Sequence, residues 1–232
     1  MSNVAYSSEY RKRYNNYQSL FKAGNFTGNK EVHLSDAYFI QLSEYRAKIG
    51  DYSCHGHTCE LFTTPIESVA KWHSIHNYGG FHKIIKHSNG KEYLIFNQDL
   101  YGYSVLDIES RKIMQFFPEK SLQGGETFIW TDIEYSPISN VLAVIGCYWA
   151  CPYGVQLFTF DSPMSEKQKH IDLINFFEGS HEIYDDIDFV KWEHGDLHIM
   201  KFNTETEEAE SEVITQNRYM TWLSERGKEL WP

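Results

Sequence analysis

The chain has 232 residues, of which 41% are hydrophobic and 16% aromatic, so it can bury a core and is not an intrinsically disordered tail. It contains no run of about 18 apolar residues, and we expect no membrane-spanning helix. The formal net charge is −11, and residues 161–232 hold 17 acidic against 7 basic side chains. This balance argues against nucleic-acid binding, because phosphate contacts need clustered Lys and Arg.

The amino terminus lacks the features of an export signal. The segment MSNVAYSSEYRKRYNNY has no apolar core and no small-residue cleavage site, so we expect a cytoplasmic protein. The four cysteines form two local pairs, Cys54/Cys59 and Cys147/Cys151. In a reducing compartment, free thiols or metal ligands are favoured over disulfides for such pairs.

In chain order, the sequence predicts helix, then strands, then helix. Residues 1–23 form a predicted N-terminal helical segment, with Tyr14, Tyr17 and Phe21 at helical spacing. Residues 24–215 contain short runs rich in β-branched and aromatic residues, such as EYLIF, NVLAVI and VQLFTF, separated by SNG, SPISN and EHGD turns. Residues 216–232 form a predicted C-terminal helix.

The strand region repeats itself. The pairs Gly79–Gly80 and Gly124–Gly125 lie 45 residues apart, and the pairs Tyr101–Gly102 and Tyr153–Gly154 lie 52 apart. The triplet Leu-Phe-Thr at 61–63 recurs at 157–159. This self-similarity predicts repeats of about 45–50 residues, placed near 24–78, 79–123, 124–178 and 179–215.

Repeats of this length, each built from about four strands, resemble the blades of β-propeller proteins of the WD40-like kind. The resemblance lies only in the length and strand pattern of the repeats over about residues 24–215, since no repeat ends in WD or opens with GH. It implies a mainly β fold of four antiparallel sheet repeats, propeller-like, with short helices at both termini.

The chemically unusual residues fall where we expect connections between strands. GCYWACPYG (146–154) lies between two predicted strands, and its expected counterparts are SCHGHTC (53–59), NQDLYG (97–102) and NTETEEAE (203–210). Equivalent connections in a propeller emerge on one face. We therefore expect these four to share one rim, and loops on a rigid β scaffold are where binding residues gather.

The first functional hypothesis is a non-enzymatic protein-binding module. Tyr148, Trp149 and Tyr153 would be large anchors of the kind that dominate interfaces, unless Trp149 packs beneath the turn. An acidic loop would steer a basic protein partner toward them, through Glu205, Glu207 and Glu208. One specific version is an inhibitor or immunity-type protein that masks a basic enzyme such as a nuclease.

The alternative is a metal-dependent enzyme or a zinc-stabilised domain. Cys54, His55, His57 and Cys59 lie within six residues, and thiolate and imidazole are the ligands that zinc prefers. Cys147 and Cys151 could complete such a site, act as a regulatory disulfide, or simply pack. Neither cysteine spacing matches the common C-x2-C zinc pattern, so small packed thiols and polar loop histidines are the competing interpretation.

Catalytic signatures are absent from the sequence, which has no G-x-S-x-G, P-loop, H-E-x-x-H or dinucleotide glycine motif. Asp185, Asp186 and Asp188 could bind calcium, act as paired acids, or only solvate a strand edge. Asp132 and Glu134 could point into a central channel as an acidic pair, or face solvent. A third hypothesis is a structural subunit that forms a homo-oligomer.

Overall fold

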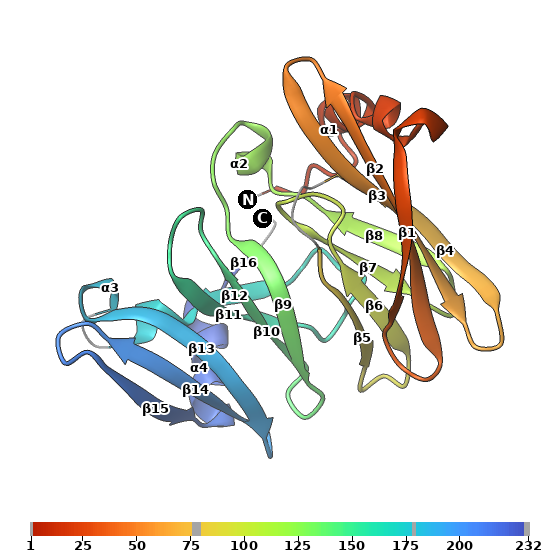
Figure 1. The fold of residues 1–232 in the computed structure, drawn as a ribbon. Coiled ribbons are helices and arrows are strands. Elements are labelled where there is room, and N and C mark those ends of the chain that lie inside the picture. The colour runs from red at the N-terminus through yellow and green to blue at the C-terminus, as the bar shows by residue number, and fades with distance from the viewer. Residues whose placement is uncertain (1, 76–79, 178–179, 230–232) are drawn as a thin grey trace. The chain divides into compact units, whose positions relative to one another are not determined.

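The computed structural model describes residues 2–75, 80–177 and 180–229, and this part of the chain is mainly β (Figure 1). In it, sixteen strands form four sheets. The chain divides into two compact units: unit 1 comprises residues 1–2, 86–90 and 119–232, and unit 2 comprises residues 3–85 and 91–118. Among the described residues, no helix has the length and apolar character needed to cross a membrane.

Unit 2 consists of two sheets in which each strand lies beside the next in the chain. The first sheet contains β1 (Phe26–His33), β2 (Tyr38–Ile49), β3 (Tyr52–Thr63) and β4 (Glu67–Ser74). The second contains β5 (His82–Lys86), β6 (Glu92–Phe96), β7 (Tyr103–Asp107) and β8 (Lys112–Phe116). A shared core joins them, with Ile40, Leu61 and Trp72 from the first sheet packed with Leu94 and Phe96 from the second.

The N-terminal segment covers part of unit 2. Helix α1 (Ser8–Asn15) begins where the Ser7 hydroxyl accepts the Tyr10 N–H, and the 3-10 turns η1 (Gln18–Phe21) and η2 (Ala23–Asn25) follow it. Leu20 of η1 is fully buried. It approaches β3 at Gly56, where a Cβ would lie 2.7 Å from the Leu20 Cδ2. A Cβ there would also lie 2.9 Å from the Ser74 carbonyl oxygen, and because backbone cannot yield as a side chain can, position 56 must be glycine.

Unit 1 contains the other two sheets. The larger has the order β16-β12-β11-β10-β9 and contains β9 (Ile129–Ser136), β10 (Val141–Cys147), β11 (Tyr153–Thr159), β12 (Lys169–Asp172) and β16 (Lys228–Glu229). The smaller contains β13 (Tyr184–Glu193), β14 (Asp196–Asn203) and β15 (Glu208–Ile214). The helical segments of the unit are α2 (Glu119–Leu122), η3 (Leu173–Phe176), α3 (Ser180–Ile183) and α4 (Gln216–Arg226).

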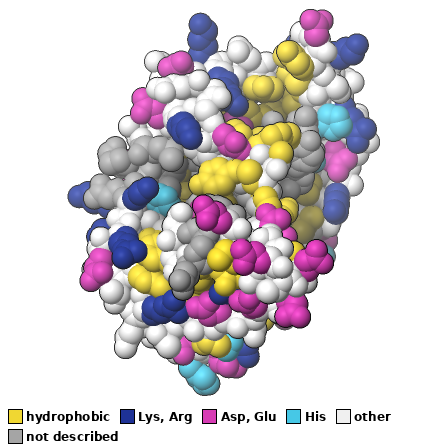
Figure 2. Space-filling view, turned by 90° about the vertical axis from the view of Figure 1, so that its left-hand side faces the viewer, with side chains coloured by type: hydrophobic (Ala, Val, Ile, Leu, Met, Phe, Trp, Pro, Cys, Tyr) yellow, Lys and Arg dark blue, Asp and Glu magenta, His cyan; other side chains and the backbone are white. Residues whose placement is uncertain are grey.

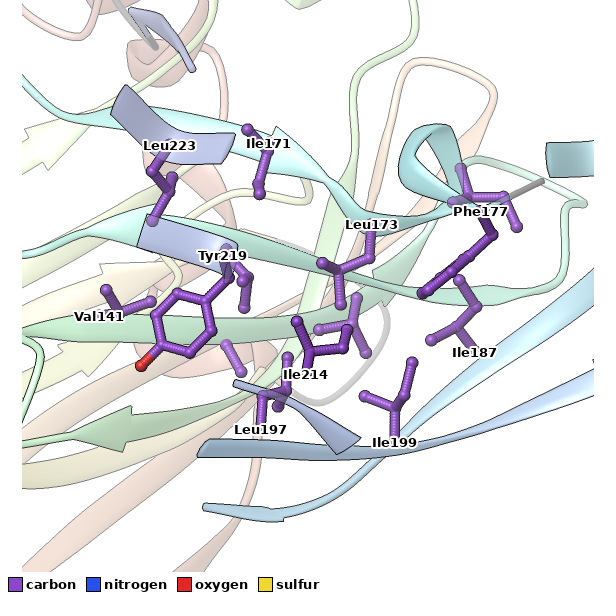
Figure 3. Packing of buried hydrophobic residues seen from close by; sticks show 14 residues of the cluster. Val141, Ile171, Leu173, Phe177, Ile187, Leu197, Ile199, Ile214, Tyr219 and Leu223 are labelled. Carbon is purple, nitrogen blue, oxygen red and sulfur yellow. The ribbon is translucent and has the colours of Figure 1, made fainter. Parts of the chain in front are cut away.

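The core of unit 1 lies between its two sheets and α4 (Figure 3). Tyr219 and Leu223 of α4 point into the same cluster as Val141 and Leu197. The buried Tyr219 hydroxyl hydrogen-bonds to the Gly195 carbonyl oxygen at 2.6 Å. Because burying a hydroxyl without a partner is costly, this bond ties the helix to one position over the sheets.

The prediction of a mainly β chain with four antiparallel sheets and short helices near both ends is confirmed. The matched triplets at 61–63 and 157–159 both lie in the third strand along the chain in their sheets, β3 and β11. Two of the predicted repeat boundaries, 78/79 and 178/179, fall outside the described residues. The same is true of the last three residues of the predicted C-terminal helix. Within the described part, that helix ends at Arg226.

Candidate functional site

The stretch GCYWACPYG forms a β-hairpin in unit 1, as predicted. Strands β10 and β11 pair in register from Val141↔Thr159 to Cys147↔Tyr153, which leaves residues 148–152 as the loop. A β-bulge opposite β9 precedes the loop at Ile145/Gly146. A Cβ at position 146 would meet the Ile129 carbonyl oxygen, so only glycine permits this close approach. We call residues 147–153 the aromatic hairpin.

Two carboxylates from other parts of unit 1 hold the aromatic hairpin. The Trp149 N–H donates to Glu126, and the Tyr153 N–H donates to the Asp186 Oδ1 at 2.9 Å. Within the loop, the Cys151 N–H donates to the Tyr148 carbonyl oxygen at 3.0 Å, and Ala150 adopts a left-handed φ of 58°. The loop is thus fixed by hydrogen bonds at both ends, which reduces the entropy it would lose on binding a partner.

The three aromatic side chains of the hairpin face solvent to a large extent. Tyr148 is 38% exposed, Trp149 55% and Tyr153 48%. Trp149 therefore does not pack beneath the turn. The Tyr148 ring contacts the Phe128 ring edge-on, with 5.4 Å between centroids. Figure 2 shows one face of the molecule, on which hydrophobic side chains lie among acidic, basic and other ones.

A groove of about 210 Å³ opens beside the aromatic hairpin. Its hydrophobic lining includes Phe128, Tyr148, Tyr153, Ile174, Tyr184 and Ile187, and its acidic lining comes from Asp172 and Asp185. The side-chain amide of Gln156 donates to Asp172 Oδ2 at 3.1 Å and to the Tyr148 hydroxyl at 3.4 Å. Burial first, and the nearby Asp172 charge second, raise the pKa of Tyr148. Its hydroxyl therefore stays protonated at neutral pH.

Two of the predicted acidic residues, Glu205 and Glu207, lie in the turn that follows β14, and Glu208 is the first residue of β15. Glu205, Glu207 and Glu208 are exposed, and the Asn203 side chain accepts the Glu205 N–H at 3.0 Å. Asn203 pairs with Tyr184 at the first residue of β13, and Tyr184 also lines the groove. The acidic turn and the groove consequently meet at the same end of β13.

The placement of SCHGHTC as a connection is wrong. Residues 53–59 lie inside β3 and pair with β2 from Lys48↔Ser53 to Leu42↔Cys59. The actual turn is at Gly50–Asp51, where Gly50 has a φ of 61°. The connection 97–102 does join β6 to β7, but Asn97 and Asp99 are buried in unit 2. The four expected connections therefore do not form one exposed rim.

Strand geometry also separates the proposed zinc ligands. Side chains alternate along a strand, so Cys54 faces away from His55, His57 and Cys59. Among the described residues, no three His, Cys, Asp or Glu side chains are grouped closely enough to hold a metal ion. The residues present do not fit a single zinc site, and the zinc hypothesis gains no support.

His55, His57 and Cys59 instead line a cavity of about 450 Å³ in unit 2. The His57 Nε2 lies 4.0 Å from the Glu44 carboxylate. Desolvation lowers the pKa of His57, and the Glu44 charge only partly opposes this. Burial raises the pKa of the Cys59 thiol to about 12, so Cys59 is a packed thiol and a poor nucleophile.

Sequence reasoning missed the residues that complete the groove. Asp172 and Tyr184 come from β12 and β13. Glu126, which precedes β9 and holds the hairpin, was missed as well. YDDIDF was interpreted as solvated strand edge, calcium ligands or paired acids, but Asp186 anchors the hairpin across 33 residues of sequence. The available signal was an acidic side chain close to the aromatic residue that begins a strand. Such a signal does not indicate which distant segment of the chain the side chain contacts.

No known protein-family model matches this chain, and a search of curated proteins finds none with significant similarity.

Proposed function

We propose that this protein is a non-enzymatic binding module that captures a basic protein partner with the aromatic hairpin. The observation that carries the proposal is the exposure of Tyr148, Trp149 and Tyr153 on a loop that is fixed in place by Glu126 and Asp186. Large aromatic side chains on a preorganised loop give much contact area for little entropy loss, and such residues dominate binding energy at interfaces.

Charge supports a basic partner. Asp172 and Asp185 line the groove, the turn at 204–207 adds exposed glutamates, and residues 161–232 have ten more acidic than basic side chains. Such a surface accelerates the encounter with a positively charged protein. An inhibitor or immunity-type protein that masks a basic enzyme, such as a nuclease, is the version of this function that we favour.

We extend the proposal to the architecture, and consider the four sheets to be propeller-like blades. The equivalent positions of the matched triplets in β3 and β11, and the strand-by-strand order within the sheets, support this view. An experimental structure in which the sheets surround a common axis is the expected result. Two sandwiches without a common axis would contradict it.

Replacement of the exposed aromatic side chains tests the function. The double variant Trp149→Ala/Tyr153→Ala should lose capture of a partner that the parent protein retains from a lysate of its native cells, because both anchors are removed. The matched control is Tyr52→Ala, a 79% exposed tyrosine in unit 2. Circular dichroism and thermal melting should show that both variants fold.

The control should retain the partner in the same amount as the parent protein. If the double variant captures the partner as well as Tyr52→Ala does, the aromatic hairpin is not the interface.

A further inference from the structure

We propose that the groove beside the aromatic hairpin is a subsite for an arginine side chain of the partner, an inference that rests on the proposed function. The occupant follows from the groove lining, which places tyrosines next to carboxylates. A guanidinium group is the protein cation that both stacks on aromatic rings and pairs with a carboxylate through parallel hydrogen bonds.

The aromatic part of the subsite comes from two strands. Tyr148 follows β10 and Tyr184 begins β13, and both line the groove. The Gln156 amide hydrogen-bonds to the Tyr148 hydroxyl and to Asp172. This shared contact positions one tyrosine and one carboxylate together before a ligand arrives, which is what preorganised recognition requires.

Two carboxylates form the acidic part of the subsite: the fold holds Asp172 in place, and Asp185 is exposed. Asp172 is half-buried and pairs with Gln156 across β11 and β12. Asp185 is exposed, and none of the contacts found among the described residues gives it a hydrogen bond or an ion pair. The first carboxylate is thus held by the fold, and the second is available to an incoming cation.

Tyr184, one of the tyrosines that line the groove, already binds a cation inside the protein. The Lys201 Nζ lies 4.3 Å from the Tyr184 ring centroid and 4.6 Å from that of Phe177. Glu212 pairs with Lys201 at 2.7 Å, and Glu210 lies 3.9 Å away. Glu212 also pairs with Arg218 at 2.7 Å, so two glutamates offset two cations beside the groove. The Lys201 cluster shows that this end of β13 stabilises a positive charge with aromatic rings and carboxylates.

Single amino acids with both ends chemically blocked test the subsite in the whole 232-residue chain. The probes are N-acetyl-arginine methylamide, its citrulline counterpart, which has nearly the same shape without the charge, and its lysine counterpart. Binding is measured from the NMR shifts of the backbone amides of residues 147–151, 153–154 and 184–187. We expect a saturable shift with the arginine probe, with at least tenfold weaker binding of citrulline and several-fold weaker binding of lysine.

A variant of the groove carboxylates, compared with a control outside the groove, shows whether the arginine probe binds in the groove. Asp172→Asn/Asp185→Asn should weaken arginine binding at least tenfold, whereas Asp188→Asn, an exposed β13 carboxylate outside the groove lining, should change it less than twofold. Equal binding of citrulline, equal binding of lysine, or undiminished binding to the double variant would each overturn the arginine subsite.

Partner capture separates this inference from the proposed function. If Asp172→Asn/Asp185→Asn captures the partner normally while Trp149→Ala/Tyr153→Ala does not, the subsite is wrong and the binding function stands. If the aromatic double variant captures the partner normally, the proposed function fails, whatever the groove binds.

Discussion

The two cysteine-containing segments each carry a pair of cysteines but have opposite structures. Residues 53–59 lie in the middle of a twelve-residue strand, and residues 147–153 form the tip of a hairpin. Backbone chemistry explains the difference. Segment 53–59 has no proline and pairs with β2 along its whole length, whereas Pro152 has no N–H to donate and Ala150 adopts a left-handed conformation. The ability to form the backbone hydrogen bonds of a sheet, and not the presence of cysteines, determines which segment becomes a loop.

Thiol reactivity should show the largest difference between the segments. Cys59 is 1% exposed and burial raises its pKa from the ordinary value of 9.0 to about 12, while Cys151 is exposed. A rise of this size lowers the thiolate fraction at pH 8 about a thousandfold relative to an ordinary thiol. Iodoacetamide labelling followed by peptide mass spectrometry should modify Cys151 first and Cys59 last.

Because the thiolate is the reactive form, the rate at Cys59 should still rise with pH above pH 9, where an ordinary thiol is already largely ionised. Labelling of Cys59 as fast as that of Cys151 in the folded protein would contradict the placement of residues 53–59 in a buried strand.

Substitution of glycine at the base of the hairpin should have the next largest effect. Gly146→Ala places a methyl group against the Ile129 carbonyl oxygen. We expect it to reduce the free energy of unfolding by about 3 kcal/mol, because backbone cannot move aside as a flexible side chain can. Urea denaturation measures this loss.

Gly154, the residue directly paired with Gly146, provides the matched control. A Cβ there has no neighbour within 4 Å, so Gly154→Ala should change stability by less than about 0.5 kcal/mol. Equal effects of the two substitutions would show that the bulge does not define the hairpin.

Loss of one hairpin anchor should have the smallest effect on stability. Asp186→Ala removes the acceptor of the Tyr153 N–H, which should cost about 1 kcal/mol because the bond is partly solvated. The same variant should weaken partner capture several-fold, since the loop is less ordered before binding.

Asp186→Asn keeps a side-chain oxygen acceptor and should restore both stability and capture, while Asp188→Ala should affect neither. If all three variants capture the partner as well as the parent protein does, the loop is not preorganised by Asp186.

The fold class and the hairpin were predictable from local signals. Strand runs flanking Gly146 and Pro152 indicated the turn, and the EHGD and SNG turns were also found where expected. The error at residues 53–59 came from overlooking Gly50–Asp51, a two-residue turn signal one step earlier in the chain. The expectation for residues 53–59 rests on the alignment of residues 61–63 with residues 157–159 in the repeat, and this alignment does not reveal the earlier turn.

The groove could not be predicted because it depends on contacts between distant segments. Tyr153 meets Asp186 across 33 residues, and Trp149 meets Glu126 across 23. No local periodicity specifies that β13 lies beside the hairpin. The same limit applies to Lys201, whose aromatic and acidic neighbours come from three separate stretches of the chain.

Hydrogen–deuterium exchange on the protein alone and bound to its captured partner tests the central claim most directly. We predict slower exchange in residues 147–154 and 184–187 in the complex, with residues 53–59 unchanged, because the aromatic hairpin and groove form the interface. Protection confined to unit 2, with residues 147–154 exchanging as in the free protein, would contradict this account.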